Sequence, residues 1–169
     1  MQEKYKLKAK INFLAYYQIV GGAIGIIFLV WLLVSTLPVQ GLNSILFLMM
    51  AVFFALSICA GWLLLEKRTE AGLTLSKINQ ILQIIGFGFG GFGFKYVAGI
   101  MLSLGIDLKD DANFIFNFSI TKLEFFINSS KDLAKVEVNL VAIYLVYFII
   151  KIQDTILYRR KIGVVNEDD

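Results

Sequence analysis

The sequence contains no histidine, one cysteine and one proline among its 169 residues. The absence of histidine excludes imidazole metal ligands and Ser–His or Cys–His nucleophiles. The lone Cys59 excludes an intramolecular disulfide and paired-thiol chemistry. Charged residues are also scarce, at 17%, whereas 58% of the residues are hydrophobic, so little sequence remains for a separate soluble domain. We therefore expect a single integral membrane domain over residues 1–169 that is not an enzyme and has no catalytic, cofactor or metal site.

Four long apolar stretches, separated by charged residues, dominate what is present. Each is close to the roughly 20 residues that a helix needs to cross about 30 Å of hydrocarbon. With their flanks, the predicted spans cover residues 11–37, 44–65, 76–106 and 138–158. Residues 107–137 then form an external loop, and a cytoplasmic tail follows the last span. The predicted fold is an all-α membrane protein, a four-transmembrane-helix bundle.

Basic residues are concentrated at one set of span ends. Eleven of the 16 lie in the N-terminal tail, in the link between the second and third spans, and at the end of the fourth span. Because such residues favour the cytoplasmic side, we expect both termini to be cytoplasmic, in a bacterial inner (plasma) membrane. Positive charge beside a span is typical of an inner-leaflet anchor, so no nucleic-acid partner is expected.

Small residues recur in the first predicted span, where Gly21 and Gly25 are four residues apart. Glycines at this spacing allow the backbones of membrane helices to approach closely. The preferred interpretation is helix packing within the bundle. Self-association of subunits is the alternative, and it uses the same contacts.

The third predicted span is unusually rich in glycine, with five glycines in eight residues. Glycine this dense weakens a helix, so a kink or break is expected. On a helix, Gly86 and Gly90 share one face, and Gly91, Lys95 and Gly99 share another.

Lys95 follows these glycines inside the apolar run, and two placements are open. If the span is centred near Gly93, Lys95 lies near mid-bilayer, where a charge is a functional candidate. If residues 73–94 cross instead, Lys95 anchors at the outer interface. We prefer the interfacial placement, because no acidic residue lies in the apolar core of the other spans to pair with Lys95.

A second pair of charged candidates lies in the fourth span. Lys151 and Asp154 are three residues apart on one helix face. We expect them to pair while reaching toward the cytoplasmic headgroups. A proton or ion relay is the functional alternative.

In the external loop, apolar and polar residues alternate with a period of two, which favours strands. The run from Phe114 to Ile120 shows this alternation, and a second run leads into the fourth span. We predict a small β-hairpin or three-stranded extracytoplasmic insertion between the third and fourth helices, with a turn at residues 128–132. A hairpin alone is marginal in water, so its phenylalanine face needs a cover. The preferred cover is the helix bundle, and a partner protein is the alternative.

These features favour a non-enzymatic accessory, assembly or regulatory subunit of a membrane complex. Its expected partners are the lipid bilayer and another membrane protein or further copies of itself. The alternative is a small channel or transporter, in which the glycine-rich third span supplies a broken helix and Lys95 attracts anions.

Overall fold

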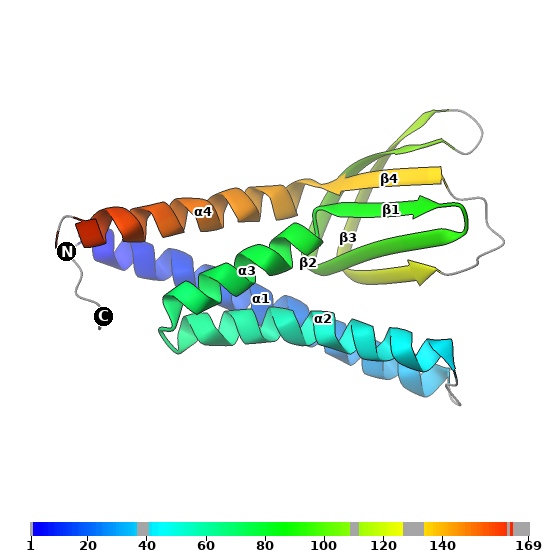
Figure 1. The fold of residues 1–169 in the computed structure, drawn as a ribbon, viewed down its shortest axis with the longest axis horizontal. Helices are drawn as coiled ribbons and strands as arrows, with labels where there is room; N and C mark the ends of the chain where they lie inside the picture. The colour runs from blue at the N-terminus through cyan, green and yellow to red at the C-terminus, as the bar shows by residue number, and fades with distance from the viewer. Residues whose placement is uncertain (1, 37–40, 109–111, 127–133, 162, 164–169) are drawn as a thin grey trace.

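The computed structural model describes residues 2–36, 41–108, 112–126, 134–161 and 163. The helices in this part are α1 (Gln2–Ser35), α2 (Leu42–Leu65), α3 (Thr69–Leu82) and α4 (Leu140–Lys161). The strands are β1 (Ile85–Phe89), β2 (Phe92–Asp107), β3 (Asn113–Phe126) and β4 (Ala134–Asn139). The fold is therefore mixed α/β, and the predicted all-α bundle is wrong (Figure 1).

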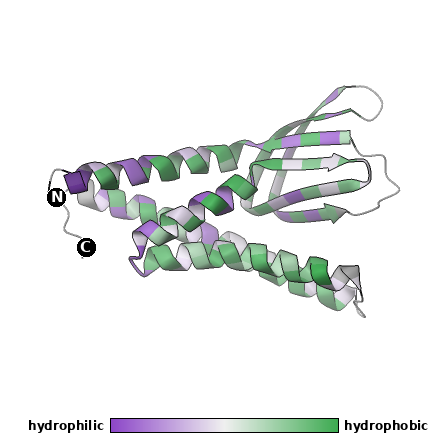
Figure 2. Ribbon diagram, in the orientation of Figure 1, coloured by the Kyte–Doolittle hydropathy of each residue, from purple (hydrophilic) through white to green (hydrophobic). Residues whose placement is uncertain are grey.

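Three of the helices are long and apolar enough to cross a membrane. The segments concerned are Tyr5–Ser35, Ser44–Leu65 and Leu140–Lys161. They coincide with three of the four predicted spans and are compatible with a membrane location. In Figure 2, α2 is almost entirely hydrophobic, whereas hydrophilic residues gather where α1 begins and α4 ends.

The third predicted span, residues 76–106, is not one helix. Its first residues belong to α3, whose 14 residues extend only about 21 Å, and the rest forms β1 and β2. The alternation of glycine and phenylalanine explains the strands, because a period of two places all the glycines of a strand on one face. Gly90 and Gly91 connect β1 to β2 with φ of 56° and 82°, as a tight hairpin turn with two left-handed residues requires.

The four strands form one antiparallel sheet that curls back on itself. The order is β1-β4-β2-β3, with an additional pairing of β1 with β2. β2 pairs with β1 at its beginning and with β4 at its end, and β4 also pairs with β1. These three strands therefore close a ring. To do so, β2 reverses direction at an irregularity between Val97 and Ile100, where Gly99 has φ of 118°.

β3 follows β2 through this bend and extends the sheet beyond the ring. It pairs with β2 on both sides of the irregularity, and Thr121 adopts φ of 40° there. Strands are thus confirmed within the predicted external loop, but they pair with residues that were assigned to a helix. The predicted turn at residues 128–132 lies outside the described residues.

α4 and the sheet pack against different parts of α1. Leu145 and Ile149 of α4 pack with Leu14 and with Leu73 of α3 in one core cluster. In Figure 1, α4 runs beside the half of α1 that begins the chain, and the sheet follows where α4 begins, with its bend against the middle of α1 at Gly21. The beginning of α1 and the end of α4 consequently lie at the same end of the molecule.

Candidate functional site

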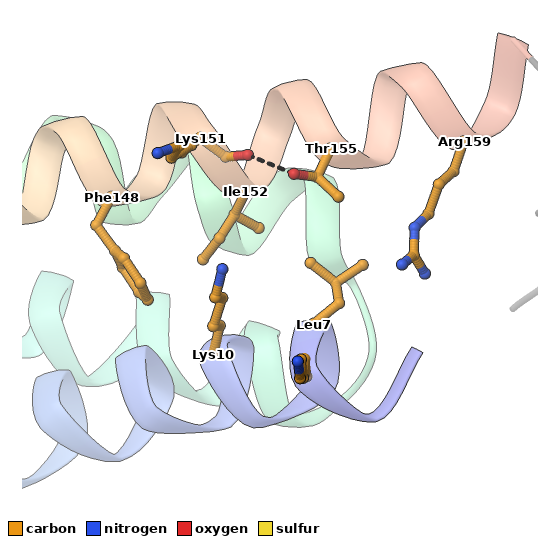
Figure 3. Close-up of a pocket in the computed structure, with 8 residues that line it drawn as sticks. Leu7, Lys10, Phe148, Lys151, Ile152, Thr155 and Arg159 are labelled. Carbon is orange, nitrogen blue, oxygen red and sulfur yellow. Dashed lines mark hydrogen bonds between the residues drawn. The ribbon is translucent and has the colours of Figure 1, made fainter. Parts of the chain in front are cut away.

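A pocket between α1 and α4 brings together basic residues from the two ends of the chain. Its volume is about 180 Å³, and the side chains that face it are shown in Figure 3. It is lined by Lys6, Leu7, Lys10, Phe148, Lys151, Ile152, Thr155 and Arg159. The sequence placed these cations at one membrane face, but it did not reveal that they share a pocket.

Lys151 lines this pocket, and its amine contacts Tyr147 rather than Asp154. Its Nζ atom lies 5.3 Å from the ring centroid of Tyr147, in a cation–π contact. Among the residues that the structure describes, no ion pair joins Lys151 to Asp154, whose side chain is exposed. The expected pairing is therefore replaced by an aromatic contact one turn earlier on the helix.

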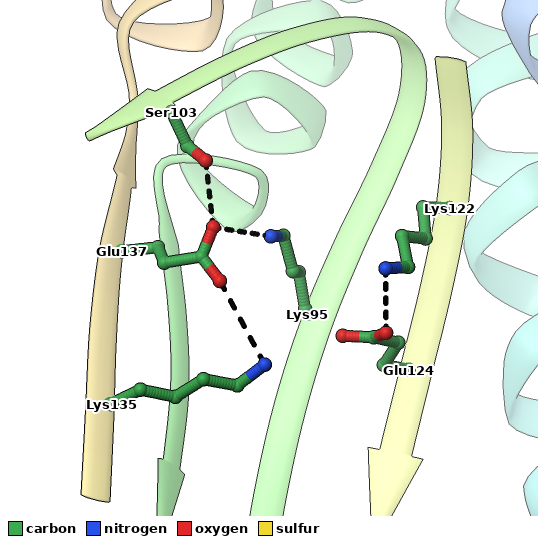
Figure 4. A network of polar contacts seen from close by, with 6 residues as sticks. All are labelled: Lys95, Ser103, Lys122, Glu124, Lys135 and Glu137. Atoms are coloured by element: carbon green, nitrogen blue, oxygen red, sulfur yellow. Dashed lines mark hydrogen bonds and ion pairs between the residues drawn. The ribbon is translucent and has the colours of Figure 1, made fainter. Parts of the chain in front are cut away.

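The second concentration of charge is an ion pair inside the strand ring (Figure 4). The Nζ atom of Lys95 lies 2.5 Å from Oε2 of Glu137, and both side chains are buried. The hydroxyl of Ser103 donates to the same carboxylate oxygen at 2.7 Å. Lys135 approaches the other oxygen of this carboxylate at 3.9 Å. Glu137 thus receives contacts from β2 and from its own strand.

Glycines make room for these side chains. A Cβ atom on Gly86 would lie 3.0 Å from Cγ of Lys95, and one on Gly105 would lie 2.7 Å from Cγ of Glu137. The glycines of β1 and β2 therefore permit a charged interior in a very small ring.

The electrostatics of the ring favour a charged carboxylate. Burial by itself raises the pKa of Glu137, but hydrogen bonds from Lys95 and Ser103 and the charges of Lys95 and Lys135 outweigh it. The net result is a pKa below the ordinary value. A fully paired, hydrogen-bonded carboxylate is suited to holding strands together.

This pairing corrects the sequence-based view of Lys95. Neither placement on a helix applies, because Lys95 lies on β2. The expectation that it lacks an acidic partner is also wrong. The alternation around Glu137 did predict a strand that leads into the fourth span. The pairing was missed because Lys95 was assigned to a helix, whereas it lies on the strand that pairs with β1 and β4.

The remaining candidate glycines mark close approaches and turns within the chain. A Cβ atom on Gly21 would lie 2.7 Å from the backbone of Ala98, and one on Gly99 would lie 2.5 Å from the hydroxyl of Tyr17. Gly25 faces the ring of Phe54 on α2. Gly25 therefore packs against a helix, as expected, whereas Gly21 packs against β2.

A buried polar network, which the sequence did not reveal, joins this contact region to the other helices. The hydroxyl of Ser57 donates to the carbonyl of Gln18 at 3.0 Å, and the amide of Asn79 donates to Ser57 at 3.2 Å. The hydroxyl of Tyr96 lies 2.7 Å from the carbonyl oxygen of Phe53. The network connects α1, α2, α3 and β2, and thereby fixes the sheet against the helices.

Within the described ranges, no group of three or more His, Cys, Asp or Glu side chains is placed to hold a metal ion. No protein-family model matches the chain, and neither the curated proteins nor the solved structures include a match. The fold and the sites define a class of protein. It is a mixed α/β protein with three membrane-compatible helices, a small strand ring and a basic pocket. Its function has to be argued from these surfaces.

Proposed function

We propose that the protein is a non-enzymatic accessory or assembly subunit that binds another membrane protein through its sheet. The proposal rests on one observation: β3 has an exposed apolar face and an edge that no described strand pairs, in a sheet whose bend contacts the middle of a helix apolar enough to span a bilayer.

The exposed face of β3 is large and aromatic. The exposed fractions of Phe114, Phe116, Phe118 and Ile120 are 92%, 67%, 60% and 57%. Half-exposed Leu104 on β2 extends the same apolar face. A contiguous apolar surface of this kind is typical of an interaction site.

The position of the sheet along α1 and α2 indicates whether lipid or protein covers the apolar face of β3. The bend of β2 contacts α1 at Gly21 and α2 at Phe53, and both residues lie near the middle of a candidate span. If α1 and α2 cross the bilayer, the bend of β2 and the part of β3 paired with it lie at the depth of the lipid tails.

At that depth, the open edge of β3 requires a partner that forms hydrogen bonds. In the described part of the chain, β3 pairs only with β2, so its other edge has unpaired backbone N–H and C=O groups. Each unsatisfied group costs several kcal/mol in hydrocarbon, and lipid tails cannot satisfy it. A protein segment laid along β3 would satisfy these groups and cover the aromatic face.

The proposal is tested on tagged protein extracted from its own membranes in mild detergent, by native mass spectrometry with identification of co-purifying chains. The parent is expected to carry a stoichiometric membrane partner, which the Phe116→Ser/Phe118→Ser variant loses. The matched control is Phe28→Ser/Trp31→Ser, which changes two exposed aromatic residues on α1 and should keep the partner. A parent that stays alone and monomeric contradicts the proposal, whereas a doubled mass identifies a second copy as the partner.

The channel or transporter alternative has lost the features that suggested it. Residues 85–89 and 92–107 form strands rather than a broken helix. Lys95 is paired with Glu137 and is therefore not a free anion-attracting charge. No observation in the structure favours this alternative over a subunit.

A further inference from the structure

The α1–α4 pocket has the charge pattern of an anion-binding site. Lys6 and Lys10 come from the first turns of α1, and Lys151 comes from α4. In Figure 3, Lys10 extends from α1 toward α4, and Arg159 extends from α4 toward α1. Among the described residues, no acidic side chain lines the pocket, and none of the three lysines forms an ion pair. Like charges held together repel one another unless an anion neutralises them.

The other side of the pocket is apolar and continues onto the membrane-compatible helices. Leu7, Phe148 and Ile152 line it beside the cations. From there, the exposed side chains of Phe13 and Tyr144 extend the apolar surface along α1 and α4. A ligand with an anionic head and an apolar tail matches this arrangement, whereas a free anion uses only half of it.

We propose that this pocket binds the phosphate of an anionic phospholipid, whose acyl chains lie along Phe148 and the neighbouring apolar surface. Basic pockets between membrane helices recognise lipid headgroups of this type. The volume of about 180 Å³ suits a compact headgroup and is below the roughly 300 Å³ at which sites for drug-sized molecules begin. The site is distinct from the exposed face of β3 and does not depend on the proposed partner.

The test titrates phosphatidylglycerol into the full chain in neutral detergent and measures the thermal unfolding midpoint and native mass spectra. Phosphatidylglycerol is expected to raise the midpoint and to remain bound, while phosphatidylcholine does neither. In the Lys10→Gln/Lys151→Gln variant, the apparent affinity for phosphatidylglycerol should fall by on the order of 30-fold, because two cations next to the phosphate are removed.

Two control variants show whether a loss of affinity for phosphatidylglycerol comes from the pocket itself. Lys8→Gln/Lys161→Gln removes the same charge from the same two helices outside the pocket, and it should retain the affinity within about threefold. Lys10→Arg/Lys151→Arg keeps the charge and should also bind, which separates lost binding from lost folding. Equal losses in both glutamine variants, or no effect of phosphatidylglycerol on the parent, overturn the proposal. An equal response to inorganic phosphate at the same concentration also overturns it, since the source of the phosphate is then not a lipid.

Discussion

At the scale of single residues, Lys95 and Glu137 are coupled by burial. Their side chains are 7% and 5% exposed, so neither charge can be rehydrated when its partner is removed. Breaking a buried pair costs about 3–5 kcal/mol, whereas replacing both members with apolar residues of similar size is often neutral or stabilising.

We therefore expect Lys95→Met and Glu137→Leu each to lower the free energy of unfolding by about 3–5 kcal/mol, and the double variant to recover most of the loss. Denaturant unfolding in detergent measures the coupling as a double-mutant cycle. The partly exposed pair Lys122–Glu124, at 2.7 Å, is the control, and its loss should cost less than about 1 kcal/mol. Additive effects at Lys95 and Glu137 would show that the pair is not coupled.

The same carboxylate predicts a pH dependence. The pKa of Glu137 is lower in the folded protein than its ordinary value of 4.5, so the unfolded state binds the proton more readily. Its contribution to stability is complete above about pH 4.5 and is lost as the pH falls through the folded-state pKa.

On acidification from about pH 6 to about pH 3, the unfolding midpoint of the parent should fall further than that of Glu137→Gln, which has no carboxylate to protonate. The difference between the two proteins is the informative quantity, because all other carboxylates are common to both. Parallel pH curves would contradict the pKa assigned to Glu137.

At the scale of elements, α1 and β2 approach each other backbone to backbone at Gly21 and Ala98. A methyl group on Gly21 would lie 2.7 Å from the backbone carbon of Ala98, which cannot rotate away as a side chain could. Gly21→Ala should therefore separate α1 from β2 and lower the free energy of unfolding by about 1–3 kcal/mol.

The neighbouring Val20→Ala variant is the control, since its side chain is 54% exposed and its truncation should cost within about 0.5 kcal/mol. Thermal unfolding of both variants, together with the near-ultraviolet circular dichroism of the aromatic side chains, measures the effect. Equal stability of Gly21→Ala and the parent would show that the contact between α1 and β2 is loose.

The elements also show how far the sequence alone could lead. Hydropathy placed α1, α2 and α4, because each contains an apolar run long enough to cross a bilayer. It failed for most of the predicted span 76–106, where residues 85–106 belong largely to strands, because mean hydropathy does not distinguish a spanning helix from apolar strands. The alternation of Gly86 and Gly88 with phenylalanines was the relevant pattern, since a period of two does not fit a helix. The pairing of Lys95 with Glu137 could not be predicted without knowledge of the ring, because the ring brings together residues that are distant in the sequence.

At the scale of the whole molecule, the basic segments gather at one end. The end of α2 leads into Arg68, and at the start of α3 Glu70 forms an ion pair with Arg160 of α4. Lys6 and Arg159 share the α1–α4 pocket at this end as well. The end of α1 lies at the opposite end (Figure 1).

This arrangement predicts a labelling pattern. In a Cys59→Ser background, single cysteines at Arg68 and Lys161 should react with a membrane-impermeant maleimide from the same side, and a cysteine at Thr36 should react from the other side. Labelling of intact cells and of inverted vesicles measures the two sides. Reaction of all three positions from one side would show that α1 and α2 do not cross the membrane.

The closure of the strand ring constrains the order in which the chain can mature. β1 and the end of β2 both pair with β4, so neither has its final neighbour until residues 134–139 have left the ribosome. The side chain of Asn139, at the end of β4, accepts a hydrogen bond from the N–H of Val141 at the start of α4. The strand that closes the ring is thus joined directly to the start of α4. Until β4 is made, residues 85–107 are an apolar segment whose strands lack this neighbour, so the last quarter of the chain completes the sheet.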